Sequence, residues 1–296
     1  MPRVDRTAFR AMGTEVILVG PAGNRAFGRA AAVVASIFER EEHRFSRFRP
    51  ESELSRVNAT AGSWRRVSSG FAELIAFALE AWRGTARRFD PTVLDAVVAA
   101  GYDRDFDELI AGARAQLRPP RPCGRAGEIA LDADRLRLPE GVGLDLGGVA
   151  KGWTVDLAAV AAADVLPWAL VNGGGDLRLA GIPPAEPVTV AVEDPETTDG
   201  EVGRIALNEG ALATSSTTRR AWGPGLHHLI DPSTGLPADG VVLQATVWAP
   251  RCADAEVASK DALLVGEPYL ERGAALLVLR DGRIATNLSM SEADAA

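Results

Sequence analysis

The chain has 296 residues, 47% of them hydrophobic and 24% charged, which is typical of a globular protein that buries a substantial core. Its formal net charge of −8 argues against a nucleic-acid partner, because phosphate binding needs a basic surface. The sequence has no apolar run of about 18 residues, so no membrane span is expected. Residues 1–20 lack the pattern of a secretory signal, and the two cysteines form no CxxC pair. A cytoplasmic protein without a disulfide framework or thiolate metal site is therefore expected.

In the N-terminal half, apolar periodicity predicts strands and helices in mixed order. A strand is expected over residues 11–19, followed by a helix that Asn24 caps. The polar segment 45–58, rich in Arg and Ser, is expected to be irregular. A second amphipathic helix is predicted over 69–88.

The C-terminal half is predicted to be mostly strand. After a proline-rich connection at 118–127, a hairpin is expected over 128–141, and a short strand precedes a helix at 148–163. Further strands are expected at 168–181, 187–194, around Ile205, at 226–230, 241–249 and 276–287, with a helix at 253–265. This order indicates a single α+β domain over 1–288 with mixed, largely antiparallel sheets and flanking helices, and a disordered tail at 289–296.

Two glycine-rich segments are suited to an anionic ligand. DLGGVAKG (145–152) places an acid, two glycines and a lysine at a helix start, where free N–H groups attract anions. NGGGD (172–176) has more glycines than a hairpin requires, which favours close approach by a ligand or another strand. Neither segment matches a dinucleotide fingerprint or a P-loop, and a helix entry and a tight hairpin are the structural alternatives.

Three more segments concentrate turn-forming and hydrogen-bonding side chains. RFDPTV (88–93) and LATSSTTRR (212–220) suit a polar or phosphate ligand, although a helix-ending turn and a hydroxyl-rich edge loop are commoner explanations. HHLIDPSTGLP (227–237) places His227 and His228 before a turn in which Pro fixes φ and Gly allows positive φ. A packing histidine is the structural alternative there.

Taken in order, these segments resemble the ApbE family, the FAD:protein FMN transferases. The resemblance covers nearly the whole chain and rests on AMGT (11–14), FSRFRPESELSRVN (45–58), RFDPTV (88–93), LDLGGVAKGWTVD (144–156), LVNGGGDLRLAG (170–181), LATSS (212–216) and HHLIDPSTGLP (227–237). It implies an ApbE or T-fold-like α+β fold. It also implies an enzyme that splits FAD at its pyrophosphate, releases AMP and attaches FMN by a phosphoester to a Ser or Thr of an acceptor flavoprotein.

The resemblance also implies roles for individual residues. It places the following residues around FAD: Met12, Phe48, Arg88, Phe89, Asp90, Asp145, Lys151, Thr214 and Leu229. His228 matches the signature histidine and is the catalytic candidate, which either takes the proton of the attacking hydroxyl or attacks phosphorus itself. Asp231 and its turn are expected to fix the position of His228, and His227 is expected to be a packing neighbour.

A magnesium site is also implied, and the chain departs from the family pattern there. Gly148 matches a position that offers its carbonyl to magnesium. Family members carry an Asp in the last helix with a Thr or another Asp four residues later, whereas the matching residues here are Glu256 and Lys260. The other register, Asp254 with Ala258, also lacks the second ligand. A protonated lysine offers no lone pair and repels a divalent cation, so we expect weak magnesium dependence. A solvated surface ion pair between Glu256 and Lys260, which is easy at this helical spacing, is the structural alternative.

Two other functions remain open from the sequence. An FAD pyrophosphatase would use water in place of the acceptor hydroxyl. A flavin-binding protein without turnover is suggested by the altered metal site. The acceptor protein and the oligomeric state have no signal in the sequence.

Overall fold

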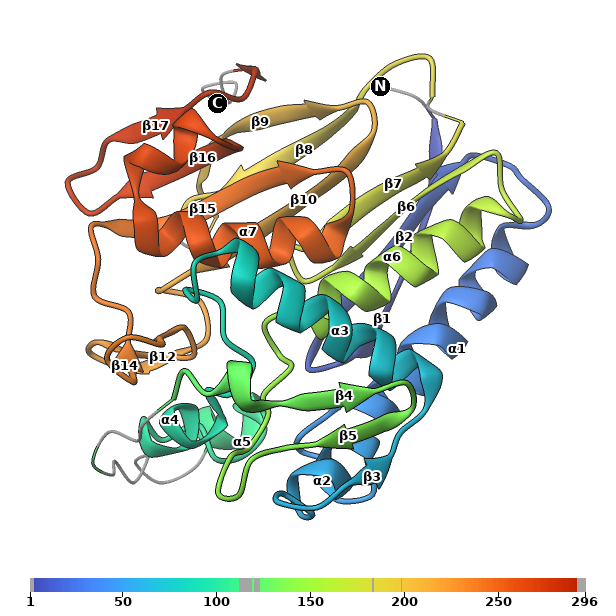
Figure 1. Ribbon diagram of the computed structural model, residues 1–296. Helices are drawn as coiled ribbons and strands as arrows, with labels where there is room; N and C mark the ends of the chain where they lie inside the picture. The colour runs from blue at the N-terminus through green and yellow to red at the C-terminus, as the bar shows by residue number, and fades with distance from the viewer. Residues whose placement is uncertain (1–2, 112–118, 120–122, 183, 198, 292–296) are drawn as a thin grey trace. The chain divides into compact units, whose positions relative to one another are not determined.

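The computed structural model describes residues 3–111, 119, 123–182, 184–197 and 199–291 (Figure 1). The described residues divide into two compact units, and the single domain expected over 1–288 stays a prediction. Unit 1 comprises the described residues within 1–39, 151–218 and 240–296, and unit 2 comprises those within 40–150 and 219–239. The chain passes between the units four times, so neither unit is one continuous segment.

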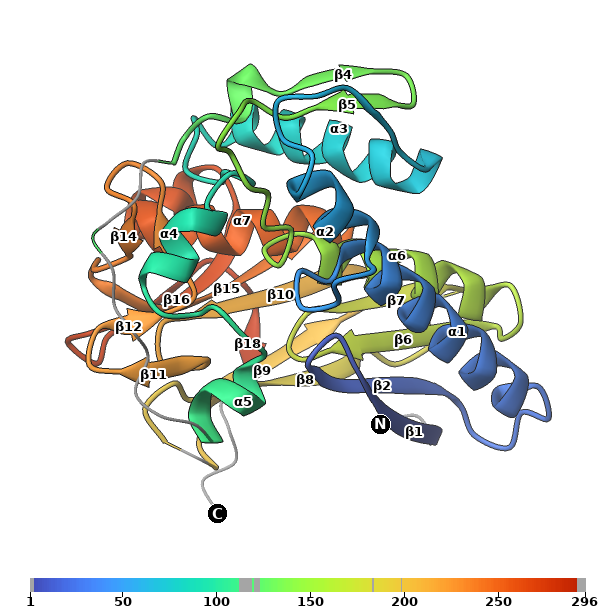
Figure 2. The ribbon, with the colours of Figure 1, turned by 90° about the horizontal axis from the view of Figure 1, so that it is seen from below.

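Unit 1 is built on an eight-stranded sheet in which all neighbouring strands are antiparallel. In spatial order the strands are β1 (Val4–Ala11), β2 (Thr14–Pro21), β6 (Trp168–Gly173), β7 (Leu177–Gly181), β10 (Gly210–Ser216), β15 (Val242–Ala249), β16 (Ala274–Leu279) and β17 (Ile284–Thr286). Helices α1 (Phe27–Phe45, with 27–39 in unit 1), α6 (Ala150–Ala163) and α7 (Cys252–Val265) lie on one face of this sheet (Figures 1 and 2). The predicted α+β fold with largely antiparallel sheets and flanking helices is confirmed.

A three-stranded sheet covers the other face of the large sheet. It consists of β8 (Val188–Glu193), β9 (Glu201–Leu207) and β18 (Met290–Ser291) (Figure 2). Strand β6 is apolar at successive positions because both of its faces are covered: Val171 packs toward the helices and Leu170 packs toward β8 and β9. Strand β18 pairs with β9, so regular structure reaches residue 291, beyond the expected start of the tail at 289. Residues 292–296 of the expected tail lie outside the described residues.

Unit 2 combines short helices with three small sheets. Its helices are α2 (Glu53–Asn58), α3 (Ser69–Gly84), α4 (Leu94–Ala99) and α5 (Phe106–Ala111), with a 3-10 turn η1 (Ala126–Glu128). Its strands are β3 (Arg65–Arg66), β4 (Ala130–Asp132), β5 (Arg135–Arg137), β11 (Ala221–Gly223), β12 (Leu226–His227), β13 (Ile230–Asp231) and β14 (Leu236–Pro237). A second 3-10 turn, η2 (Glu267–Glu271), belongs to unit 1. The hairpin expected over 128–141 is confirmed as β4 and β5.

A hairpin replaces the single strand expected over 11–19. Ala11 pairs with Thr14, and the two residues between them, Met12 and Gly13, have φ of 51° and 68°. Positive φ at both positions is the type I′ geometry that suits a two-residue hairpin, and it is strained for a methionine. Strand β1 is at the edge of the sheet and fully or partly exposed along its length, so it lacks the apolar pattern that would have revealed it.

Two segments expected to be irregular have regular structure. Within 45–58, the Ser52 hydroxyl accepts the Ser55 N–H and begins helix α2, whose Leu54 and Val57 are buried. The segment expected to be an edge loop at 212–220 contains most of β10, an interior strand of the large sheet. Conversely, residues 142–146 form no strand before α6. The Asn58 side chain accepts the Leu144 N–H and donates to the Leu144 carbonyl oxygen, so neither group is available to a neighbouring strand.

Candidate functional site

The predicted site residues divide between the two units. Unit 1 contains Met12, Lys151, Thr214, Glu256 and Lys260, and unit 2 contains Phe48, Arg88, Phe89, Asp90, Asp145, Gly148, His228 and Leu229.

In unit 1, four charged side chains gather at the start of α6, the β6–β7 turn and helix α7. Lys151 Nζ forms an ion pair with Asp176 Oδ2. Glu256 Oε2 accepts the Gly152 N–H at 2.8 Å, and Glu256 Oε1 is 3.5 Å from Lys260 Nζ. The two acids are almost fully buried, whereas the lysine side chains are each 17% exposed. The cluster therefore presents ammonium groups, not carboxylates, to its surroundings.

Burial sets the protonation chemistry of this cluster. Loss of hydration raises the pKa of Glu256, and the Lys260 charge lowers it in turn. The Asp176 charge also raises the pKa of Glu256, and the Lys151 charge lowers it. The Lys260 and Lys151 ammonium groups therefore offset part of the effect of burial on the Glu256 carboxyl.

Glycines allow the close packing that brings these elements together. A Cβ on Gly152 would lie 2.7 Å from the Cys252 carbonyl oxygen, so only glycine lets α6 meet the start of α7. Gly174 has φ of 68°, and a Cβ there would lie 2.1 Å from the Thr14 hydroxyl. The glycine at 174 is thus explained by the approach of β2, one of the two alternatives that the sequence left open.

Thr214 and Met12 lie elsewhere in unit 1. Thr214 Oγ1 is 2.9 Å from Thr246 Oγ1, whereas the next residue, Ser215, bonds Ser259 on α7 at 2.7 Å. Since successive side chains of a strand point to opposite faces, Thr214 faces away from α7. Met12 occupies the β1–β2 turn and packs against the helix-side core.

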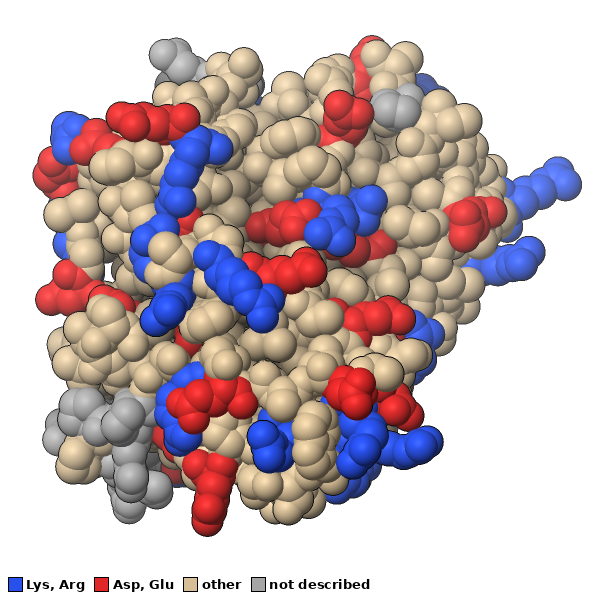
Figure 3. Space-filling model, viewed as in Figure 1, with Lys and Arg blue, Asp and Glu red and all other residues tan. Residues whose placement is uncertain are grey.

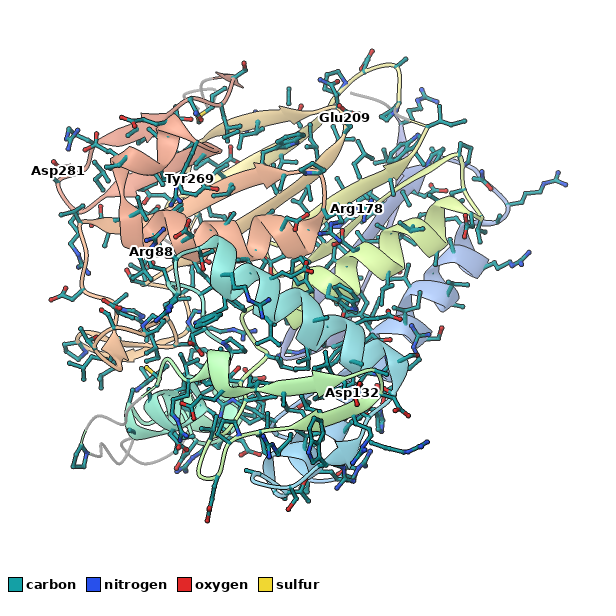
Figure 4. All side chains as sticks on the ribbon, viewed as in Figure 1. Arg88, Asp132, Arg178, Glu209, Tyr269 and Asp281 are labelled. Carbon is teal, nitrogen blue, oxygen red and sulfur yellow. The ribbon has the colours of Figure 1, made fainter. Side chains whose placement is uncertain are left out.

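A charged contact that the sequence did not reveal fixes helix α7 in unit 1. Arg178, labelled in Figure 4, reaches from β7 to Asp156 on α6, with 2.7 Å between Nη1 and Oδ1. The Asp156 carboxylate also accepts the N–H groups of Cys252 and Ala253 at 2.8 and 3.0 Å. An acid at a helix N-terminus stabilises the helix, so Asp156 holds α7 at a fixed position along α6.

In unit 2, the histidine segment is a rigid hairpin. Strands β13 and β14 pair, and the Asp231 carboxylate accepts both the N–H and the hydroxyl of Ser233. The Ala238 N–H donates to the Leu229 carbonyl at 2.9 Å, which extends the hairpin toward the histidines. Asp231 therefore stabilises the turn itself, and its side chain bonds Ser233 and no histidine within the described residues.

The two histidines have different environments. His227 is 3% exposed, its Nδ1 accepts the Leu229 N–H at 3.3 Å, and its Nε2 lies 3.0 Å from the Ala238 carbonyl oxygen. Because a carbonyl oxygen only accepts, Nε2 is the donor there, and both ring nitrogens of His227 contact the backbone, which is a structural role. His228 is half-buried. The packing role that the sequence predicted for His227 agrees with this geometry.

The segment RFDPTV follows helix α3 as a turn with a buried acid. Asp90 is 4% exposed, and its Oδ1 accepts the Thr92 N–H at 2.7 Å and the Thr92 hydroxyl at 2.5 Å. Burial raises the pKa of Asp90, and the bonds from Thr92 lower it. The Trp82 indole N–H also lowers this pKa, although its geometry falls short of a full hydrogen bond. Phe89 is buried, and Arg88 is half-buried.

Arg47, which the sequence did not indicate, links two predicted site residues of unit 2. Its Nε is 3.1 Å from Asp145 Oδ2, and its guanidinium lies over the rings of Phe48 and Tyr102 at 4.2 and 4.5 Å. The Tyr102 ring continues the stack to Trp222, at 5.3 Å between centroids. The other Asp145 oxygen accepts the Gly147 N–H, one residue before Gly148. Arg47 thus brings Phe48 and Asp145 together.

Acidic and basic side chains are interspersed on the face in Figure 3. Within the described ranges, no helix has the length and apolarity that a bilayer crossing requires.

The chain is similar in sequence to a known protein family and to several named relatives. The ApbE family matches residues 12–285. The FAD:protein FMN transferase of Vibrio cholerae serotype O1 is 28% identical over 81% of this chain and 73% of its own length. The FAD:protein FMN transferase of Treponema pallidum is 29% identical over 82% of this chain and 72% of its own.

Solved structures share the fold. The ApbE protein from Thermotoga maritima has a TM-score of 0.85 at 26% identity and covers 96% of this chain and 97% of its own. The flavin transferase ApbE from Vibrio cholerae has a TM-score of 0.79 at 23% identity, covering 97% and 98%. The fold therefore extends over nearly the full length of each of these proteins.

Proposed function

We propose that the chain, which belongs to the ApbE family, is an FAD:protein FMN transferase. Its relatives in several bacteria bear this name, and they match it over about three quarters of their own length. The observation that carries the proposal is the hairpin of unit 2, in which a buried, fully bonded His227 fixes the backbone next to half-buried His228. This hairpin positions the His228 imidazole for chemistry, and the His227 imidazole stabilises the backbone beside it.

In the proposed reaction, a Ser or Thr hydroxyl of an acceptor flavoprotein attacks the FMN phosphorus of FAD. A new P–O bond forms to the hydroxyl oxygen, the P–O bond to the AMP phosphate breaks, and AMP leaves. His228 accepts the hydroxyl proton as general base. Alternatively, His228 itself attacks phosphorus and passes FMN to the acceptor in a second step. Phosphoryl transfer of either kind depends chiefly on positioning and charge neutralisation.

The remaining residues are assigned to binding FAD. In unit 1, Lys151 supplies charge for the pyrophosphate, and Met12 and Thr214 are assigned flavin or phosphate contacts. In unit 2, five residues supply aromatic surface and polar groups for the dinucleotide: Phe48, Phe89, Arg88, Asp90 and Asp145. Leu229 contributes an apolar contact beside His228. FAD is expected to bind more tightly than FMN, because FMN lacks the AMP half and leaves the contacts to that half unmade.

The test is to incubate the protein with FAD and a candidate acceptor, and to measure AMP, free FMN and protein-bound flavin. AMP with bound flavin supports the transferase, AMP with free FMN indicates a pyrophosphatase, and FAD binding without AMP indicates a non-catalytic binder. His228→Ala is expected to keep FAD binding and to lower AMP release by about 10²-fold or more. Wild-type turnover in this variant would remove His228 from the mechanism.

A further inference from the structure

Both lysines of the chain lie in the charged cluster of unit 1. The sequence has 30 arginines and two lysines, Lys151 and Lys260. Each lysine contacts a buried acid: Lys151 pairs with Asp176, and Lys260 with Glu256. An ammonium is a compact point charge, whereas guanidinium is a planar fork, so an ammonium comes closer in shape to a small cation. The other basic residues of the chain are arginines, and a lysine stands beside each of these two buried carboxylates.

The acids of helix α7 are all engaged within the protein. Glu256 has the Gly152 N–H on one oxygen and Lys260 near the other. Asp254 forms two bonds with Arg251, at 2.7 and 2.9 Å, and Asp261 accepts one from Arg272 at 2.6 Å. The Ser259 hydroxyl bonds Ser215 and the Glu256 carbonyl. Each acid of α7 thus already has a hydrogen-bond or ion-pair partner within the protein.

These residues do not fit the magnesium site that the family resemblance implies. Magnesium requires oxygen ligands in near-octahedral geometry, and an ammonium supplies no lone pair and repels a divalent cation. Across the part of the chain that the structure describes, no three His, Cys, Asp or Glu side chains are placed to hold a metal ion. The position four residues after Glu256 has a positive charge where a ligand would be needed.

Lys260 is held in a way that leaves it able to contact a ligand. Its Nζ donates to the Glu256 carbonyl oxygen at 3.1 Å and lies 3.5 Å from Glu256 Oε1. An ammonium has three N–H donors, so within the described residues one donor remains for an anion. Its side chain is 17% exposed, while Glu256 beneath it is 2% exposed. Glu256 thus orients the ammonium.

We infer that Lys260 is the built-in cation of the site, contacting the FAD pyrophosphate with Lys151, and that the protein binds FAD without a divalent metal. The inference rests on the proposed function for the identity of the anion. Glu256 acts as a positioning residue for Lys260, and no metal takes part in holding FAD.

The first test is FAD titration of the whole protein, followed by flavin fluorescence, in excess EDTA and in excess magnesium. We expect the same dissociation constant in both. Lys260→Gln, which removes the charge and leaves a polar side chain about one atom shorter, is expected to weaken FAD binding by about tenfold in EDTA. The dissociation constant of Lys260→Arg for FAD should lie between those of the wild type and Lys260→Gln. Arg29→Gln, which removes an exposed charge from α1 in the same unit, is the matched control and should bind like wild type.

Glu256→Gln separates positioning from metal ligation. The amide has one oxygen, which can accept the Gly152 N–H or face the Lys260 ammonium but not both, so Lys260 loses its orienting partner and FAD binding in EDTA should weaken. If Glu256 were a metal ligand, the same change would abolish a magnesium-dependent gain. Binding that is lost in EDTA and restored by magnesium would overturn the inference, as would a Lys260→Gln variant that folds and binds FAD like wild type.

A measurement on the unmodified chain does not depend on variants that fold. Protein with ¹³C-labelled lysine has only two lysine side chains to observe by NMR. FAD in EDTA should shift both signals, and Mn²⁺, which occupies magnesium sites, should leave their widths unchanged. Selective broadening by Mn²⁺ would overturn the inference. Failure of AMP release with these binding results intact would count against the proposed function alone.

Discussion

Arg47 and Asp145 form an ion pair in unit 2, with 3.1 Å between Nε and Oδ2, although 98 residues separate them in the chain. The same guanidinium covers Phe48 and donates to the Tyr102 carbonyl at 2.8 Å. One side chain therefore sets the positions of two residues assigned to FAD. Both members of the pair are nearly buried, so the contact is little screened by solvent.

Arg47→Ala is expected to raise the dissociation constant of FAD by about tenfold, because it removes the ion pair and the cation–π contacts together. Arg47→Lys keeps the charge without the planar fork and should be intermediate. In steady-state assays of AMP release, KM should rise while kcat stays near wild type. Arg66→Ala, at a side chain that is 83% exposed, is the control. Equal FAD affinity in all four proteins would show that Arg47 has no positioning role.

His227→Ala should destabilise the protein with little effect on chemistry. The change leaves the Leu229 N–H and the Ala238 carbonyl without their partner and opens a small cavity, a loss of about 1–3 kcal/mol. Urea unfolding measures the loss, and AMP release at a temperature where the variant is folded measures the activity. His227→Gln can donate and accept and should recover part of the stability. The exposed His43→Ala is the control, and a stability of His227→Ala equal to it would contradict the structural role.

Local patterns in the sequence predicted much of the fold, and long-range contacts account for what they missed. Helix α7 and the hairpin β4–β5 have clear periodicity and turn residues, so they were predicted nearly to their ends. Strand β10 was mistaken for a loop because its hydroxyls suggest solvent, whereas Thr246 and Ser259 satisfy two of them. Arg47 and Asp156 gave no signal, because each acts on residues far away in the sequence. The order of the motifs indicated the family, while each motif alone fitted a structural role.

The raised pKa of Asp90 predicts how stability changes with pH. An acid whose folded-state pKa exceeds its unfolded value stabilises fully below the unfolded value, near 3.9, and that stability is lost as pH rises through the folded value. The difference in unfolding free energy between Asp90→Asn and wild type should therefore move in favour of the variant from about pH 4 upward and then level off. Urea unfolding of both proteins across this range gives the difference.

Asp281 is the control for this pH dependence, because its pKa is shifted in the opposite direction from that of Asp90. The Arg283 guanidinium, 2.9 Å from its carboxylate, lowers the pKa of Asp281, so its contribution is present above the unfolded value and is lost as pH falls. Asp281→Asn should show a small difference that moves against the variant as pH rises. Parallel curves for the two variants would contradict the assignment of Asp90.

Restoring the family pair on α7 should create the magnesium dependence that the natural chain is inferred to lack. In the double variant Glu256→Asp with Lys260→Thr, the shorter carboxylate withdraws from the Gly152 N–H, and a hydroxyl replaces the ammonium four residues later. Both groups then offer lone pairs on the same helix face, and the charge that repels a divalent cation is gone. We expect FAD binding about tenfold weaker than wild type in EDTA, and a return toward the wild-type value in magnesium. Isothermal titration of magnesium into the FAD complex measures the new site directly.

Lys260→Thr alone is the matched control: Glu256 stays bonded to Gly152, so FAD binding should be weak in both conditions. A double variant that binds FAD like wild type in EDTA would show that Lys260 carries no charge the ligand needs.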